Sequence, residues 1–190
     1  MPTAQMRDTL RTKATIPGVR SLVDSVLYDT IELAAATLPP TTTFFTAIKA
    51  PHLSNLEKAN EVVYPFYIQG MALYVEGSLA DAKLALWYST LRLQISNKDF
   101  PRFPAVSLPS GGGLAGDTAI ADGTAATDSV SEMINNGAAS PLSIYKLRAP
   151  LKLIQDLQFR VIMESDPAQT LVAATNVIMC LFGMELRRLL

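Results

Sequence analysis

Few residues in this sequence can act in acid–base, nucleophilic or metal chemistry. It holds one histidine, His52, and one cysteine, Cys180. Zinc sites draw on several His and Cys ligands, so a site of that kind is not expected. A Ser-His-Asp triad could use only His52, which lies in an expected loop, and a surface histidine is the simpler interpretation. Cys180 lies in the apolar run 177–182, where a buried, inert thiol is expected.

Acidic residues and glycines offer weaker candidate sites. Asp117 and Asp122 could bind a cation, but they lack the close spacing of an EF-hand loop. The glycine run 111–113 suggests a phosphate-binding loop, but that motif usually carries a Lys–Ser/Thr pair, and residues 114–117 supply no lysine. No carboxylate pair stands out as a candidate for glycoside hydrolysis. We therefore predict no catalytic residue, no metal site, no cofactor and no small-molecule substrate, and we expect a protein that is not an enzyme.

The composition points to contacts with other protein chains. Hydrophobic residues make up 49% of the chain and charged residues only 17%, below the ~25% that is typical of soluble domains. A chain with so few charges has little material for a solvated surface, and large apolar patches usually mark interaction sites. The net charge of −1 gives no argument for nucleic-acid binding by the chain as a whole.

Residues 1–18 are polar and are expected to form an N-terminal arm. Basic residues outnumber acidic ones at this end of the chain, where Asp8 is accompanied by Arg7, Arg11, Lys13 and Arg20. The arm could contact nucleic acid, lipid headgroups or a neighbouring subunit, and a mobile, solvated terminus is the alternative interpretation. The first fifteen residues lack the apolar core of a secretory signal, and no run approaches the ~20 apolar residues that span a bilayer. We therefore expect a soluble protein that is made in a cytoplasm.

Alternating apolar and polar residues predict a mainly β fold. The pattern is clearest at residues 91–96, 145–153 and 157–164, where one face of an antiparallel sheet would be wet. Residues 64–75 also predict a strand, with Gly70 as a possible bulge. Residues 177–186 are apolar at both odd and even positions, which predicts that both faces of this strand are buried. About eight strand candidates between turn signals favour a sandwich, and eight strands in two packed sheets form a jelly roll.

Two short helices are expected within this β domain. The apolar residues of segment 19–27 follow helical spacing, which predicts an amphipathic helix. A capping-box pattern at Ser78 to Asp81 predicts a second helix over residues 79–89. Trp87 and Tyr88 lie on this second helix, where they could pack in the core or anchor an interface.

Prolines and glycines define the irregular segments. Three prolines predict an extended, irregular segment over 101–109, and a long loop rich in Gly and Ala is expected at about 110–140. Such long loops are usually functional or disordered. The resulting domain prediction is an N-terminal arm at 1–18 and a single jelly-roll domain at 19–190.

Several segments between residues 60 and 190 resemble phage virion proteins as a set. The nearest class is the single jelly-roll capsid proteins of tailless icosahedral phages, and the resemblance is one of pattern, carried by Tyr64–Gly70, Leu91–Phe100, Leu108–Gly113, Leu147–Leu153 and Phe159–Val161. It implies a virion protein that assembles with copies of itself and with other virion proteins, and it transfers no catalytic residue.

The resemblance makes a capsid subunit the leading hypothesis for function. A tail, baseplate or spike component of a virion and a carbohydrate-binding β-sandwich stay open as alternatives. The candidate interface residues are Arg7, Arg11, Lys13, Trp87, Tyr88, Gly111, Gly112 and Gly113.

Overall fold

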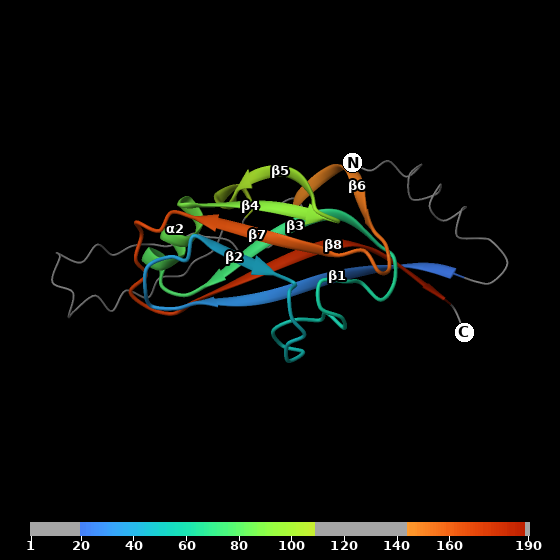
Figure 1. Cartoon of the computed structure of the whole chain (residues 1–190), viewed down its shortest axis with the longest axis horizontal. Helices are drawn as coiled ribbons and strands as arrows, with labels where there is room; N and C mark the ends of the chain where they lie inside the picture. The colour runs from blue at the N-terminus through green and yellow to red at the C-terminus, as the bar shows by residue number, and fades with distance from the viewer. Residues whose placement is uncertain (1–19, 109–143, 189–190) are drawn as a thin grey trace.

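The computed structural model describes residues 20–108 and 144–188, which form two antiparallel sheets of four strands each (Figure 1). The strand order is β1-β8-β3-β6 in the first sheet and β2-β7-β4-β5 in the second. The bounds are β1 Arg20–Leu33, β2 Thr41–Phe44, β3 Phe66–Glu76, β4 Ser89–Ile95, β5 Lys98–Pro104, β6 Tyr145–Leu153, β7 Phe159–Ser165 and β8 Thr175–Arg188. The expectation of a mainly β, two-sheet fold is confirmed. The predicted arm and the predicted loop at 110–140 lie outside the described residues.

The core lies between the two sheets and follows from the alternation along each strand. In β4, Leu91, Leu93 and Ile95 are buried while Arg92 and Gln94 face outward, because successive side chains point to opposite faces. Large apolar side chains from both sheets fill the space between them, among them Phe44, Phe66, Ile68, Leu73, Phe159, Val161, Met179 and Leu181. The same alternation places polar residues on the outer face of the second sheet.

The predicted helix at 79–89 is confirmed as α2 (Leu79–Trp87). The hydroxyl of Ser78 accepts a hydrogen bond from the backbone N–H of Asp81 at 3.1 Å, as the capping pattern predicts. The 3₁₀ turn η1 (Ala105–Ser107) follows β5. No helix in the described ranges is both long enough and apolar enough to cross a membrane.

The predicted helix at 19–27 is wrong, because those residues belong to the strand β1. All fourteen residues of β1 pair with β8, from Arg20 opposite Arg188 to Leu33 opposite Thr175. The helical spacing of apolar residues in a short segment is overridden by a partner strand that lies at the other end of the sequence. Short apolar segments are ambiguous between helix and strand for this reason.

The segment predicted to be irregular at 101–109 is a strand over part of its length. Pro101 and Pro104 lie in β5, which is an edge strand of the second sheet. An edge strand leaves one side of its backbone unpaired, so prolines that cannot donate hydrogen bonds are tolerated there.

Two glycines mark close approaches within the first sheet. The predicted bulge at Gly70 is confirmed by a register shift between Ile68 and Gly70. A Cβ atom at Gly183 would lie 2.0 Å from the backbone oxygen of Tyr67, so the strands β8 and β3 require glycine there. The predicted burial of residues 177–186 on both sides is confirmed in part: Val177, Met179 and Leu181 are buried on the core side, whereas on the other side Cys180 is buried and Ile178 is half-buried.

Candidate assembly surface

Trp87 and Tyr88 are exposed at the end of α2. Their exposed fractions are 68% and 46%, so the structure favours the interface interpretation of these two residues over core packing. The other candidate interface residues, Arg7, Arg11, Lys13, Gly111, Gly112 and Gly113, lie outside the described residues.

A third exposed apolar residue lies on the segment that packs beside α2. The backbone of Tyr88 accepts a hydrogen bond from the N–H of Asp166, which begins the connection from β7 to β8. Val172 in this connection is 85% exposed. We call the surface formed by Trp87, Tyr88, Val172 and the exposed alanines 34–36 and 173–174 the end surface.

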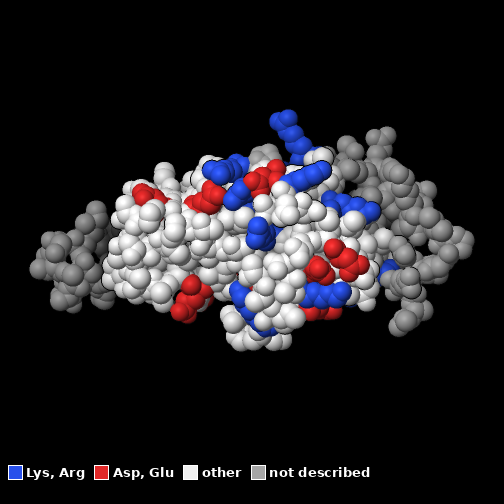
Figure 2. All heavy atoms as spheres, viewed as in Figure 1, with Lys and Arg blue, Asp and Glu red and all other residues white. Residues whose placement is uncertain are grey.

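Three connections meet at this end of the sandwich and are held by backbone hydrogen bonds. Leu38 N–H donates to Gln169 at 2.8 Å, and Leu171 N–H donates to Ala36 at 3.0 Å, so the β1–β2 and β7–β8 connections are joined. Figure 2 shows few Lys, Arg, Asp or Glu side chains at the left-hand end, where Figure 1 places α2. The end surface therefore rests on connections that backbone hydrogen bonds join to one another.

Asp81 fixes the position of α2 at this end of the sandwich. Its carboxylate is fully buried and accepts hydrogen bonds from Val172 N–H at 2.8 Å, from Ala173 N–H at 3.0 Å and from the Ser78 hydroxyl at 2.9 Å. The capping pattern identifies the contact with Ser78. No local signal in the sequence identifies the contacts with Val172 and Ala173, because those residues are distant in the chain.

The outer face of the second sheet carries a network of charges. Arg92 on β4 forms ion pairs with Asp99 at 2.5 Å and with Glu164 at 2.9 Å, and Arg102 reaches Glu164 at 3.3 Å. The hydrogen bonds from Arg92 and from Gln94 hold the pKa of Asp99 below its ordinary value. In Figure 2 charged side chains gather along the upper edge, over β4 and β5. The charged side chains of this face are therefore suited to remain exposed to solvent.

The outer face of the first sheet is apolar by comparison. Val26 pairs with Phe182, and Tyr74 pairs with Ile178, on the side of the sheet turned away from the core. Cys180 lies on this same side, and burial raises the pKa of its thiol to about 12. In the sequence, the apolar character of this face is indicated by residues 177–186, which are apolar at both odd and even positions.

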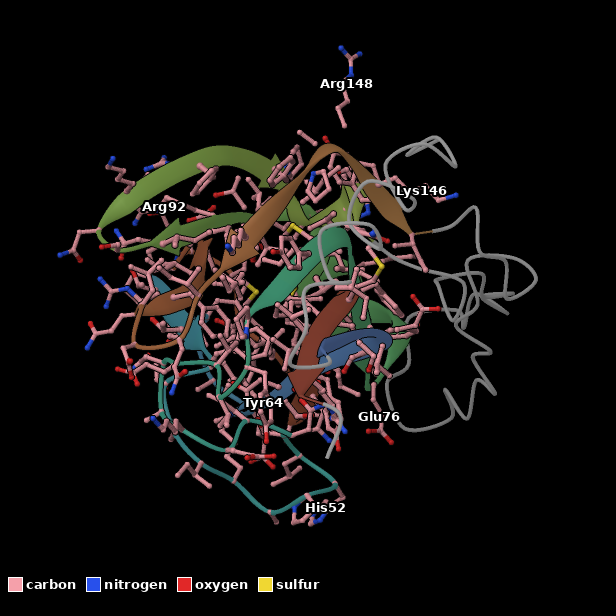
Figure 3. The ribbon with its side chains drawn as sticks, turned by 90° about the vertical axis from the view of Figure 1, so that its right-hand side faces the viewer. His52, Tyr64, Glu76, Arg92, Lys146 and Arg148 are labelled. Carbon is pink, nitrogen blue, oxygen red and sulfur yellow. The ribbon has the colours of Figure 1, made fainter. Side chains whose placement is uncertain are left out.

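The remaining candidates for chemistry lie apart from one another. His52 is exposed in the segment between β2 and β3, and Figure 3 places it at the tip of that segment, away from the body of the sandwich. In the described part of the chain no three His, Cys, Asp or Glu side chains gather as metal ligands do. A hollow of about 200 Å³ beside β1 is lined by residues such as Asn55, Glu61 and Arg187 and holds no paired nucleophile and base.

A buried ion pair fastens the segment after β2 to β1. Asp29 is fully buried and lies 2.8 Å from the ammonium of Lys49, and its carboxylate also accepts a hydrogen bond from Phe45 N–H. Phe45 has a φ of 66°, a left-handed conformation that a phenylalanine rarely adopts, and this hydrogen bond helps to hold it. We interpret this pair as structural.

Comparisons with known proteins give no independent identification, since neither a family model nor a curated protein matches this chain.

Proposed function

We propose that this fold is a jelly roll. Its four antiparallel pairs are β1 with β8, β2 with β7, β3 with β6 and β4 with β5. This nested order is what results when one long antiparallel ribbon of eight strands is rolled into two sheets, with Greek-key connections. The nested pairing is the single observation that carries the proposal.

We infer further that the chain is a structural virion protein, a capsid subunit that assembles by packing against copies of itself and other virion proteins. The end surface supports this function, because it presents exposed apolar side chains for contact. The outer face of the first sheet carries further apolar side chains that are half-buried, such as Val26, Ile178 and Phe182. The charged outer face of the second sheet would remain in water. Obligate interfaces resemble a domain core cut in half, and these surfaces have that composition.

Electron microscopy of the full-length protein, alone and with its accompanying virion proteins, tests the capsid function. Closed icosahedral shells are the expected result. The double variant Trp87→Ser with Val172→Ser should remain folded and fail to form shells, whereas Lys83→Ser, an exposed change on the same helix outside the end surface, should assemble normally. Shell formation by the double variant at the level of the control would contradict the role of the end surface.

The arm provides a second test of the capsid function. Removal of residues 1–15 should leave a folded protein that assembles poorly. Normal particles from the shortened chain would exclude an essential role for the arm.

The two alternatives give different results in the same experiments. Rings or trimers without closed shells would favour a tail, baseplate or spike component. The exposure of two consecutive aromatic residues, Trp87 and Tyr88, is the observation that favours a carbohydrate-binding sandwich. Glycan binding that is lost in Trp87→Ala and kept in Lys83→Ala would support that class and count against the capsid.

A further inference from the structure

The strand β1 lies at the edge of the first sheet, so one side of its backbone has no neighbouring strand in that sheet. Segment 53–55 closes part of this edge. Thr30 N–H donates to Leu53 at 2.8 Å, and the amide side chain of Asn55 bonds Tyr28 N–H at 2.8 Å and the backbone oxygen of Val26 at 2.6 Å. Closed in this way, the middle of β1 cannot accept another strand.

The first residues of β1 are not closed by any other described segment. The capped residues Val26, Tyr28 and Thr30 alternate along β1, and both backbone polar groups of a residue point to the same side of a strand. The N–H and C=O groups of Leu22 and Asp24 therefore point to the same edge, and no hydrogen bond to the described residues uses them there. Figure 1 shows this end of β1 extending with the end of β8 beyond the other strands. Such an edge is a template for a further strand.

We propose that residues 20–24 of β1 pair antiparallel with the same residues of a second copy of this chain, with Leu22 opposite Leu22. In this register Asp24 of each chain lies opposite residue 20 of the other, which is an arginine. Directly opposed residues of opposite charge stabilise an antiparallel pair. The two-fold symmetric pairing provides about six backbone hydrogen bonds and joins the two sheets into one.

The neighbouring registers lack this complementarity. Shifting the symmetric centre to residue 21 places Gly18 opposite Asp24, and shifting it to residue 23 places Leu22 there. Centring the pair on Asp24 would oppose two carboxylates and would require Val26, whose backbone oxygen is already bonded to Asn55. Charged residues commonly protect edge strands from pairing. Here Asp24 disfavours other registers and other partners, while the arginine four residues before it favours the one register in which the two charges of opposite sign face each other.

This inference rests on the proposed function in one respect, since a shell subunit needs a contact with its own copies. It is tested by dimerisation in solution, which is measured separately from shell formation. Sedimentation velocity of the full chain over a wide concentration range should show a reversible dimer. Asp24→Lys and Arg20→Glu should each weaken the dimer by about tenfold or more, because each places like charges opposite one another. Glu32→Lys, a change of the same sign as Asp24→Lys on the same strand but outside the paired segment, is the matched control and should leave dimerisation unchanged.

Charge exchange gives the decisive result. A mixture of Asp24→Lys with Arg20→Glu should form a mixed dimer, and the double variant carrying both changes in one chain should dimerise with itself. Circular dichroism should show that every variant is folded.

A chain that stays monomeric at all concentrations, or a dimer that is insensitive to Asp24→Lys, would overturn the pairing. Dimers that form only after residues 1–19 are removed would also overturn it, because the arm would then occupy the edge in the intact chain. Shell formation in the microscope is independent of these readouts, so monomers that build shells would refute only the pairing, and dimers that never build shells would refute only the capsid function.

Discussion

Replacing Asp81 with alanine should destabilise the protein strongly and locally. The change removes the acceptor of two backbone hydrogen bonds, from Val172 at 2.8 Å and from Ala173 at 3.0 Å, and it breaks the side-chain half of the helix cap. Hydrogen bonds to a charged group contribute about 1.5–3 kcal/mol each. Because α2 and the β7–β8 connection can relax toward solvent when released, we take the lower end and expect a loss of about 3 kcal/mol in the free energy of unfolding.

Urea unfolding checks this magnitude, with the midpoint expected to fall and the slope to stay constant. Asp99→Ala is the matched control, because Asp99 also accepts side-chain hydrogen bonds but is exposed, and exposed pairs contribute little to the free energy of unfolding. Hydrogen exchange at the Val172 and Ala173 amides should accelerate in Asp81→Ala while the amides of β4 change little. Equal destabilisation by the two variants, or unchanged exchange at these two amides, would show that Asp81 does not hold the connection.

Three further predictions concern other contacts of the fold. Gly183→Ala should lower the free energy of unfolding by about 3 kcal/mol, because the new Cβ would lie 2.0 Å from the backbone oxygen of Tyr67. Gly77→Ala should lower it by less, because its new Cβ meets the side chain of Thr175. Similar urea midpoints for the two variants would contradict this prediction. Cys180, whose pKa is raised to about 12 by burial, should react with a thiol reagent at pH 8 only after unfolding, and fast labelling of the native protein would be inconsistent with that burial. The pKa of Asp99 is lowered in the folded state, so its contribution to stability is present above the unfolded pKa of 3.8 and is lost as the pH falls through the folded pKa. NMR titration of the Asp99 carboxyl should give a pKa below 3.8, and in Arg92→Gln this pKa should move back toward 3.8. An unchanged pKa in Arg92→Gln would refute the assigned cause.

Local patterns in the sequence predict the parts of the fold that local physics determines. The alternation of Leu91, Leu93 and Ile95 predicts β4, and the capping pattern at Ser78 predicts α2, since both depend on neighbours within a few residues. The strand β1 was predicted wrongly because its partner β8 is remote in sequence. For the same reason Trp87 could be named as a candidate interface residue from its helix, while Val172 could not, because only the folded chain brings residue 172 beside Asp81 of α2.

The pairing of β1 with β8 has a consequence for the order in which the molecule forms. The strand β8 lies between β1 and β3, so the first sheet lacks its middle until the last described strand has been synthesised. During translation the earlier strands would wait with their apolar faces exposed, and chains whose contacts are mostly remote in sequence fold slowly. A chaperone that holds the growing chain would therefore matter most in the interval between the emergence of β3 and that of β8.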